Sequence, residues 1–312
     1  MVEATDRHSV LAQMPAATAA REKQGQRRTR NLLLQARERY HDVAQALRNI
    51  SLAEKRAASP AGASAHPRNH DLVTAELVEA GHIQAGLLPD AVPYLPGWDL
   101  AATLEPALET WGDFFDFIPL PCGRLGIVVA DVVDKGMGAA LYMALTRTLL
   151  RSCAPLNPQE PGETLAEVNA RIMAETHTGM FVTLFYGVLD PEAGSFRYAN
   201  GGHNPAYLFG PDEQDELVPT GMALGVVPDV CWETHTLRLT PGDTLFLYTD
   251  GAIDARAPDG DTFGLERLLS TVQAHLGHPC TSIQAAVLDE IHRFVGRAPR
   301  FDDVTLMVVT RT

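Results

Sequence analysis

Nine short runs rich in β-branched and aromatic residues follow one another after Gly97, and most are closed by Gly, Pro, Asp or Asn. This pattern is typical of β-strands. Two junctions, in LDPEAGSFRY and LTPGDTLF, are tight turns, which join antiparallel neighbours rather than the parallel strands of a βαβ repeat. The expected strands are WDLAATLEP, DFFDFIPL, RLGIVVADV, MFVTLFYGVLD, SFRYANGG, PAYLFG, THTLRLT, DTLFLYTDG and VTLMVVT.

Helical segments are segregated from these groups of strands, and the sequence contains no internal repeat. The expected helices are GAALYMALTRTLLRS, ETLAEVNARIMAET, LERLLSTVQAHL and SIQAAVLDEIHRFV. We therefore predict an α+β fold, in which two stacked, mainly antiparallel β-sheets are flanked by helices as an αββα sandwich. An N-terminal helical segment is expected to precede it.

The N-terminal part of the chain has a different composition. Residues 1–29 are polar and lack a sustained period, so we expect a disordered basic arm. From Leu33 to Ile50 apolar residues alternate spacings of three and four. This heptad stripe fits either a coiled-coil dimer or a helix packed on its own domain. The predicted organisation is the arm, a helical regulatory or dimerisation segment at residues 30–88, and a main domain at residues 89–312.

A linker and a second helix are expected inside the helical segment. Residues 58–70, ASPAGASAHPRNH, contain little that could pack, which indicates a flexible linker. The second helix is expected to begin near Asp71, an N-cap candidate, and to run to Leu88, where prolines bracket its end.

The net charge of −14 is unevenly distributed. Residues 1–70 hold twelve Lys or Arg and six Asp or Glu, so the main domain is strongly acidic. An acidic surface repels a phosphate backbone, which argues against nucleic acid as a partner. Nucleic-acid binding by the basic arm is the weaker alternative.

The sequence also argues against a membrane protein, a secreted protein and a protein built around paired cysteines. The apolar stretches are well short of the roughly 18 residues that a membrane span needs, and the N-terminus resembles no secretory signal. We therefore expect a cytoplasmic protein without a membrane partner. The four cysteines form no CxxC pair, which argues against a zinc ribbon or a dithiol redox motif.

Aspartates stand where the expected strands begin or end. Asp131 follows GIVVA, Asp250 follows LFLYT, Asp113 precedes FFDF, and Asp302 and Asp303 precede VTLMVV. Each alone is an ordinary turn or cap residue. Together, carboxylates at strand ends can converge, and clustered oxygen ligands without His or Cys favour Mg²⁺ or Mn²⁺ over zinc.

The order of motifs resembles a known family. GDFFDF, ADVVDKGMGAALYMA, FVTLFYGVLD with YANGGHNPAYLF, GMALGV, DTLFLYTDGAIDA and FDDVTLMVV occur as in the metal-dependent (PPM, type 2C) Ser/Thr protein phosphatases. The chain is most similar to the bacterial regulatory branch, which includes the stage II sporulation and sigma-factor activating phosphatases. The resemblance covers about residues 79–312.

The resemblance implies the roles of individual residues. Asp131 matches the carboxylate that bridges two Mn²⁺ or Mg²⁺ ions, and the carbonyl of Val132 matches a backbone ligand. Asp250 and Asp302 match further ligands of one ion, and Asp113 matches the acid near the second. A third ion is compatible with the family. Four of these residues are thus both catalytic and metal-binding candidates, namely Asp113, Asp131, Asp250 and Asp302.

Some positions depart from the family pattern. Trp111 and Asp134 stand where the branch usually has Gly, and Asp254 stands where Glu is common. Val133 replaces the His that eukaryotic relatives carry as a proton donor, so the general acid is unassigned. Asp303 is a weaker ligand candidate, and His203 is expected to have a structural turn role.

The resemblance implies a phosphoserine/phosphothreonine protein phosphatase in which a metal-bridging water attacks phosphorus directly. A phosphoprotein substrate is implied, such as an anti-sigma factor antagonist, together with a homodimer through the N-terminal helices. The alternative is a catalytically weak or inactive dimeric signalling scaffold with a phosphatase-like domain. The unusual residues at positions 111 and 134, Trp111 and Asp134, are the reason to retain this alternative.

Overall fold

The computed structural model describes residues 67–312 except 177–178 and 212, with side chains from residue 74 onward. The chain divides into two units, Met1–Pro67 and Arg68–Thr312, and the description below concerns the second. The predicted basic arm, heptad stripe and most of the linker lie outside the described residues.

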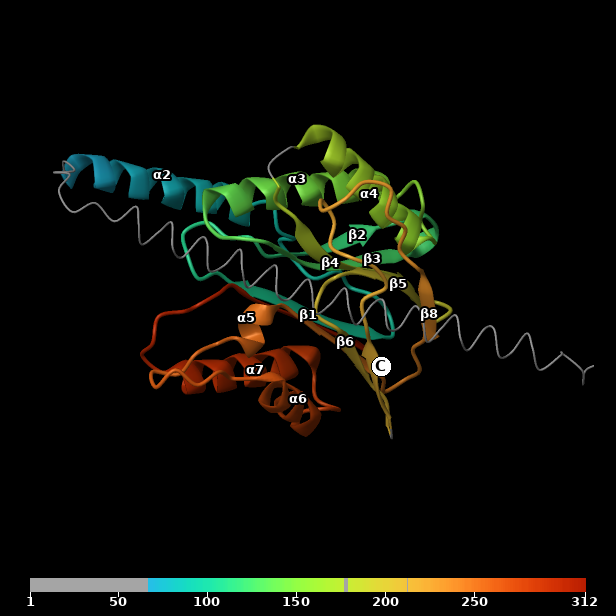
Figure 1. Ribbon diagram of the computed structural model, residues 1–312. Helices are drawn as coiled ribbons and strands as arrows, with labels where there is room; N and C mark the ends of the chain where they lie inside the picture. The colour runs from blue at the N-terminus through green and yellow to red at the C-terminus, as the bar shows by residue number, and fades with distance from the viewer. Residues whose placement is uncertain (1–66, 177–178, 212) are drawn as a thin grey trace, which may run out of the picture. The chain divides into compact units, whose positions relative to one another are not determined.

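Two five-stranded antiparallel sheets form the centre of this unit (Figure 1). The first sheet has the strand order β1-β10-β9-β6-β7, and the second has the order β2-β3-β4-β5-β8. The strands of the first sheet are β1 (Trp98–Glu105), β6 (Ala206–Phe209), β7 (Gln214–Leu217), β9 (Thr244–Tyr248) and β10 (Val304–Arg311). Those of the second are β2 (Phe114–Pro119), β3 (Leu125–Val132), β4 (Val182–Asp190), β5 (Ser195–Gly201) and β8 (His235–Arg238).

Helices cover the outer face of each sheet (Figure 1). The second sheet packs under α3 (Met137–Cys153) and α4 (Pro161–Glu175). The first packs on α5 (Asp250–Ile253), α6 (Leu265–Ala274) and α7 (Cys280–Val295). The predicted αββα sandwich is confirmed.

Three apolar layers hold the sandwich together, one between the sheets and one between each sheet and its helices. Because side chains alternate along a strand, the central strands must be apolar on both faces. In β3, Ile127 and Val129 face the layer between the sheets, whereas Val128 and Ala130 face α3 and α4. The same requirement explains the unbroken apolar runs that mark β9 and β10.

Several local features differ from the sequence predictions. The turn in LTPGDTLF joins β8 to β9, which lie in different sheets, so it is not a hairpin between antiparallel neighbours. The helix before the main domain ends at Ala85 rather than at Leu88. The helix α2 (Pro67–Ala85) begins before Asp71, so Asp71 is not its N-cap and residues 67–70 are not linker. The strand β7 was not expected, because its sequence QDEL is polar. It is an edge strand with three exposed residues, and pairing with β6 rather than burial defines it.

No helix within the described part of the chain is long and apolar enough to cross a membrane.

Candidate metal centre

Antiparallel pairing brings the aspartates at the strand ends together in two pairs. In the first sheet β9 and β10 are neighbours, so Asp250 after β9 lies near Asp302 before β10. In the second sheet β2 pairs with β3, and Phe114 lies opposite Ala130, which places Asp113 at the same end as Asp131. Each sheet therefore supplies two of the predicted carboxylates to one edge of the sandwich.

Asp113 is buried and oriented by two hydroxyls. Its Oδ2 accepts hydrogen bonds from Thr249 Oγ1 at 2.7 Å and from Thr305 Oγ1 at 2.6 Å. Burial and the neighbouring Asp303 raise the pKa of Asp113 well above its usual value, and the two hydroxyls oppose this shift. Sequence reasoning missed both threonines, because they lie 136 and 192 residues from Asp113.

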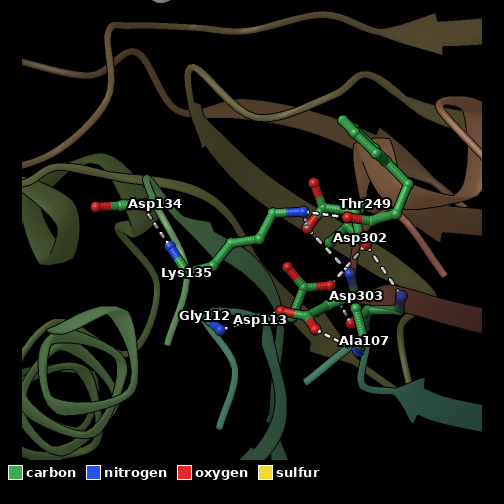
Figure 2. A network of polar contacts seen from close by, with 10 residues as sticks. Ala107, Gly112, Asp113, Asp134, Lys135, Thr249, Asp302 and Asp303 are labelled. Atoms are coloured by element: carbon green, nitrogen blue, oxygen red, sulfur yellow. Dashed lines mark hydrogen bonds and ion pairs between the residues drawn. The ribbon is translucent and has the colours of Figure 1, made fainter. Parts of the chain in front are cut away.

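Asp303 holds the loop that leads to Asp113. Its two carboxylate oxygens accept hydrogen bonds from the backbone N–H groups of Ala107, at 2.8 Å, and Gly112, at 3.1 Å (Figure 2). Burial raises the pKa of Asp303, and these two hydrogen bonds act in the opposite direction. Asp303 is therefore a positioning residue for the loop in this structure.

Asp131 stands in a strongly negative environment. Loss of hydration raises its pKa well above the usual value, and the next largest cause is the charge of Asp250. Asp113, Asp302 and Asp303 contribute in the same direction. These four leading charged neighbours are all carboxylates, so a cation at this place would favour the ionised form of Asp131.

Asp302 is paired with a lysine. Lys135 reaches across from the turn after β3 and places its Nζ 2.8 Å from Asp302 Oδ1 (Figure 2). The ammonium also donates to the carbonyl oxygen of Phe301. Sequence reasoning did not identify this ion pair, which joins residues far apart in the chain.

Two glycines permit close approach of the backbone around the carboxylates. A Cβ on Gly251 would overlap the carbonyl oxygen of Asp303 and lie 3.1 Å from the Cβ of Asp302. A Cβ on Gly112 would lie 3.0 Å from the carbonyl oxygen of Val132, the predicted backbone ligand. Position 251 therefore needs glycine for steric reasons, whereas a Cβ at position 112 would require its neighbour Val132 to shift by a few tenths of an ångström.

Asp134 and Trp111, two of the departures from the family pattern, have local roles. Asp134 adopts φ = 73°, and its Oδ1 accepts a hydrogen bond from the N–H of Lys135 at 2.9 Å. Asp tolerates this left-handed conformation better than most residues. The buried indole of Trp111 lies beside Gly81 of α2, because a Cβ on that glycine would be 3.7 Å from its Cζ3.

His203 has a larger role than the predicted turn. Its buried ring lies 2.9 Å from Thr183 Oγ1 and 3.2 Å from the carbonyl oxygen of Tyr248. Thr183 is the cross-strand neighbour of Asp131, and Tyr248 is two residues before Asp250. Burial lowers the pKa of His203 to about 4, so the imidazole is neutral and Nε2 donates to the carbonyl. The ring joins the two sheets beside the carboxylates.

The carboxylate and carbonyl oxygens at this site are the kinds of ligand that a divalent ion binds, although the side chains are not arranged as a complete coordination shell. Among the residues described, no three His, Cys, Asp or Glu side chains are arranged to hold a metal ion. Asp302 instead contacts Lys135, and Asp113 accepts from two hydroxyls. Carboxylate and carbonyl oxygens suit Mg²⁺ or Mn²⁺, and such an ion would relieve the repulsion that raises the pKa of Asp131.

Comparison with solved structures identifies the class of fold. The SiaA-PP2C domain of Pseudomonas aeruginosa matches with a TM-score of 0.70 at 22% identity, covering 79% of this chain and 99% of that domain. RsbX in complex with magnesium matches with a TM-score of 0.52 and 18% identity, covering 71% and 99%. PstP in complex with two manganese ions matches at 0.50 and 16%, covering 68% and 97%. The fold is that of the PP2C domains.

Sequence comparison identifies the family. The profile of Stage II sporulation protein E (SpoIIE) matches residues 121–312, and the chain belongs to this family of PP2C-type serine/threonine phosphatases. Protein IcfG of Synechocystis sp. is 34% identical over 265 residues, which are 76% of this chain and 41% of IcfG. Phosphoserine phosphatase RsbU of Bacillus subtilis is 28% identical over 246 residues, which are 77% of this chain and 71% of RsbU. The chain thus spans less than half the length of IcfG.

Proposed function

We propose that this chain is a metal-dependent phosphoserine/phosphothreonine protein phosphatase that acts in the cytoplasm. The observation that carries the proposal is the convergence of strand-end carboxylates from both sheets around Asp131, whose pKa is raised first by burial and then by the charge of Asp250. Such a cluster is costly without a cation, and divalent ions are the usual cation for oxygen ligands.

Asp131 would bridge two ions, with the carbonyl of Val132 as a backbone ligand. Asp250 and Asp302 would complete one coordination shell, and Asp113 would serve the other. Mn²⁺ or Mg²⁺ is proposed, since the relatives PstP and RsbX were solved with these ions. When bound, the ions supply a water of lowered pKa and neutralise the phosphoryl oxygens.

The surrounding residues keep the carboxylates in place for this chemistry. The hydroxyls of Thr249 and Thr305 orient Asp113, and Asp303 fixes the loop before it. His203 is a neutral bridge rather than a proton donor to the leaving group, because both ring nitrogens contact the protein. The proton for the leaving serine oxygen is therefore expected to come from water.

The proposed substrate is a small phosphoprotein of a sigma-factor pathway, such as an anti-sigma factor antagonist. This rests on the relatives named phosphoserine phosphatase RsbU and RsbP of Bacillus subtilis. RsbP is 23% identical over 208 residues, which are 64% of this chain and 49% of RsbP. The expected product is the dephosphorylated antagonist, detected as a mobility shift on a phosphate-affinity gel.

We further propose that residues 30–88 form a homodimer and transmit a signal to the metal centre. The contact of Gln84 on α2 with the backbone of Trp111, two residues before Asp113, supports such a route. Deleting residues 1–70 and measuring the mass in solution tests the dimer. A product that is still a dimer would rule out the arm as the sole dimerisation element.

Hydrolysis of a phosphoserine peptide with and without Mn²⁺ tests the proposed activity. The wild type is expected to require the metal, and Asp131→Asn and Asp250→Asn are expected to lose turnover while keeping their circular dichroism spectra. Asp215→Asn, on the exposed edge strand β7, is the matched control and should keep full activity. Full activity in both site variants would refute the proposal, and absence of Mn²⁺ binding by the wild type would favour the scaffold alternative.

A further inference from the structure

Lys135 is one of very few lysines in a chain whose basic residues are mostly arginines. The sequence contains three lysines, Lys23, Lys55 and Lys135, against 22 arginines. Lys135 is therefore the only lysine after position 55, and its ammonium lies on a carboxylate of the candidate metal centre. Lysine and arginine are not interchangeable, because the ammonium is a compact charge on a flexible stem.

The ammonium occupies a well-defined site. Besides Asp302 Oδ1 at 2.8 Å and the carbonyl oxygen of Phe301, it lies 4.7 Å from the centroid of the Phe301 ring. The backbone N–H of Lys135 is held by Asp134, and Gly136 follows with φ = 79°. The turn thus directs the only lysine of the described residues towards Asp302 (Figure 2).

This pairing conflicts with metal binding through the same oxygen. Asp302 Oδ1 already accepts from the N–H of Asp303, at 3.0 Å, and from Lys135. A divalent ion carries twice the charge of an ammonium, and two cations on one carboxylate oxygen repel each other. An ion bound through Oδ1 of Asp302 would therefore displace Lys135.

The displaced ammonium would still be close to the reaction. Lys135 stands four residues after Asp131, and its flexible stem remains anchored in the same turn. Its side chain is 30% exposed, so a ligand from solution can reach it. The anion that the proposed reaction brings to this place is the phosphoryl group of the substrate, and an ammonium is a good partner for it.

We propose that Lys135 is a positioning residue that changes partners, from the carboxylate of Asp302 in the metal-free chain to a phosphoryl oxygen of the substrate once a divalent ion takes Asp302. This inference rests on the proposed phosphatase function, and it adds a competitor for the metal and a phosphate contact that the aspartates do not provide.

Magnetic resonance of the lysines tests the exchange directly. The full-length chain is labelled with ¹³Cε-lysine, and Lys135→Arg identifies the Lys135 signal by its loss. Adding Mg²⁺ should shift this signal, and inorganic phosphate added afterwards should shift it again, while Lys23 and Lys55 stay unchanged. The proposal would be overturned if the chemical shift of Lys135 did not change on addition of Mg²⁺, or did not change on addition of phosphate in the presence of Mg²⁺.

Calorimetry with Mn²⁺ separates this inference from the function on which it rests. Lys135→Met removes the competing charge and is expected to bind Mn²⁺ about three- to tenfold more tightly, while raising KM for a phosphoserine peptide. Arg256→Met is the matched control, because Arg256 stacks on the same Phe301 ring at 3.8 Å without an ion pair to Asp302 in the structure. Equal affinities in wild type and Lys135→Met would refute the role of Lys135. If the wild type bound no Mn²⁺, the proposed function itself would fail.

Discussion

The side-chain amide of Gln84 pairs with the backbone of Trp111. Its Nε2 donates to the carbonyl oxygen of Trp111 at 2.6 Å, and its Oε1 accepts from the N–H of the same residue at 3.2 Å. Both residues are buried. The last turn of α2 is thereby fixed to the loop that carries Asp113.

Removing this amide should loosen the loop. Gln84→Ala leaves two buried backbone groups without partners, which costs about 1–3 kcal/mol of unfolding free energy. We also expect weaker Mn²⁺ binding, because Asp113 follows the freed segment. Urea denaturation and a metal titration measure the two effects. Glu79→Ala, on an exposed position of the same helix, should change neither.

A side chain at position 251 should separate the two strand ends of the first sheet. In Gly251→Ala the added Cβ overlaps the carbonyl oxygen of Asp303, so the backbone must shift, at a cost of about 1–3 kcal/mol. The shift moves Asp250 relative to Asp302 and should lower Mn²⁺ affinity. Gly86→Ala is the control, since its Cβ would meet only ordinary contacts near 3.4 Å. Equal stability of both variants would contradict the steric argument.

The two threonine hydroxyls that donate to Asp113 should contribute to stability cooperatively. Thr249→Val and Thr305→Val each remove one donor to Asp113 Oδ2 and are expected to cost about 1–2 kcal/mol. Because Thr249 also accepts from the N–H of Thr305, the double variant should deviate from additivity. Denaturation of the four proteins of this cycle gives the coupling energy, and strictly additive losses would show that the network does not act as a unit.

His203 should make stability depend on pH. Its pKa is about 4 in the fold, against about 6.5 in an unfolded chain, so the unfolded state binds more protons between these values. The contribution of His203 to stability should therefore be complete above pH 6.5 and fall as the pH drops towards 4, by up to about 3 kcal/mol, whereas the raised pKa values of the buried aspartates act in the opposite direction. The difference in unfolding free energy between wild type and His203→Gln should therefore decrease as the pH falls from 6.5 to 4, which urea denaturation at several pH values measures. A difference between wild type and His203→Gln that stays constant from pH 6.5 to 4 would contradict the burial argument.

Much of the fold could be predicted because the apolar patterns that mark most strands and helices are local in the sequence. Strands β3, β9 and β10 are buried on both faces, so their apolar runs are unmistakable, whereas β7 is polar and depends on its partner β6. The start of α2 was misplaced, since Asp71 has the residue type of a cap without being one.

The aspartates of the site were also visible, because each one adjoins a strand end. The residues that contact these aspartates could not be identified from the sequence. Lys135 meets Asp302, and Thr305 meets Asp113, only through the packing of one sheet on the other. No local spacing encodes such contacts, so the ligand candidates could be predicted from the sequence but the groups that position or neutralise them could not.

The most direct test of this account is a Mn²⁺ titration of the full-length chain followed by electron paramagnetic resonance, which counts free ions. The wild type is predicted to bind Mn²⁺ saturably, and Asp131→Asn, which removes the proposed bridging ligand, should weaken binding by at least ~100-fold, since even outer-shell changes cost 10–100-fold. Unchanged Mn²⁺ binding in Asp131→Asn would contradict the assignment of this carboxylate as the centre of the metal site.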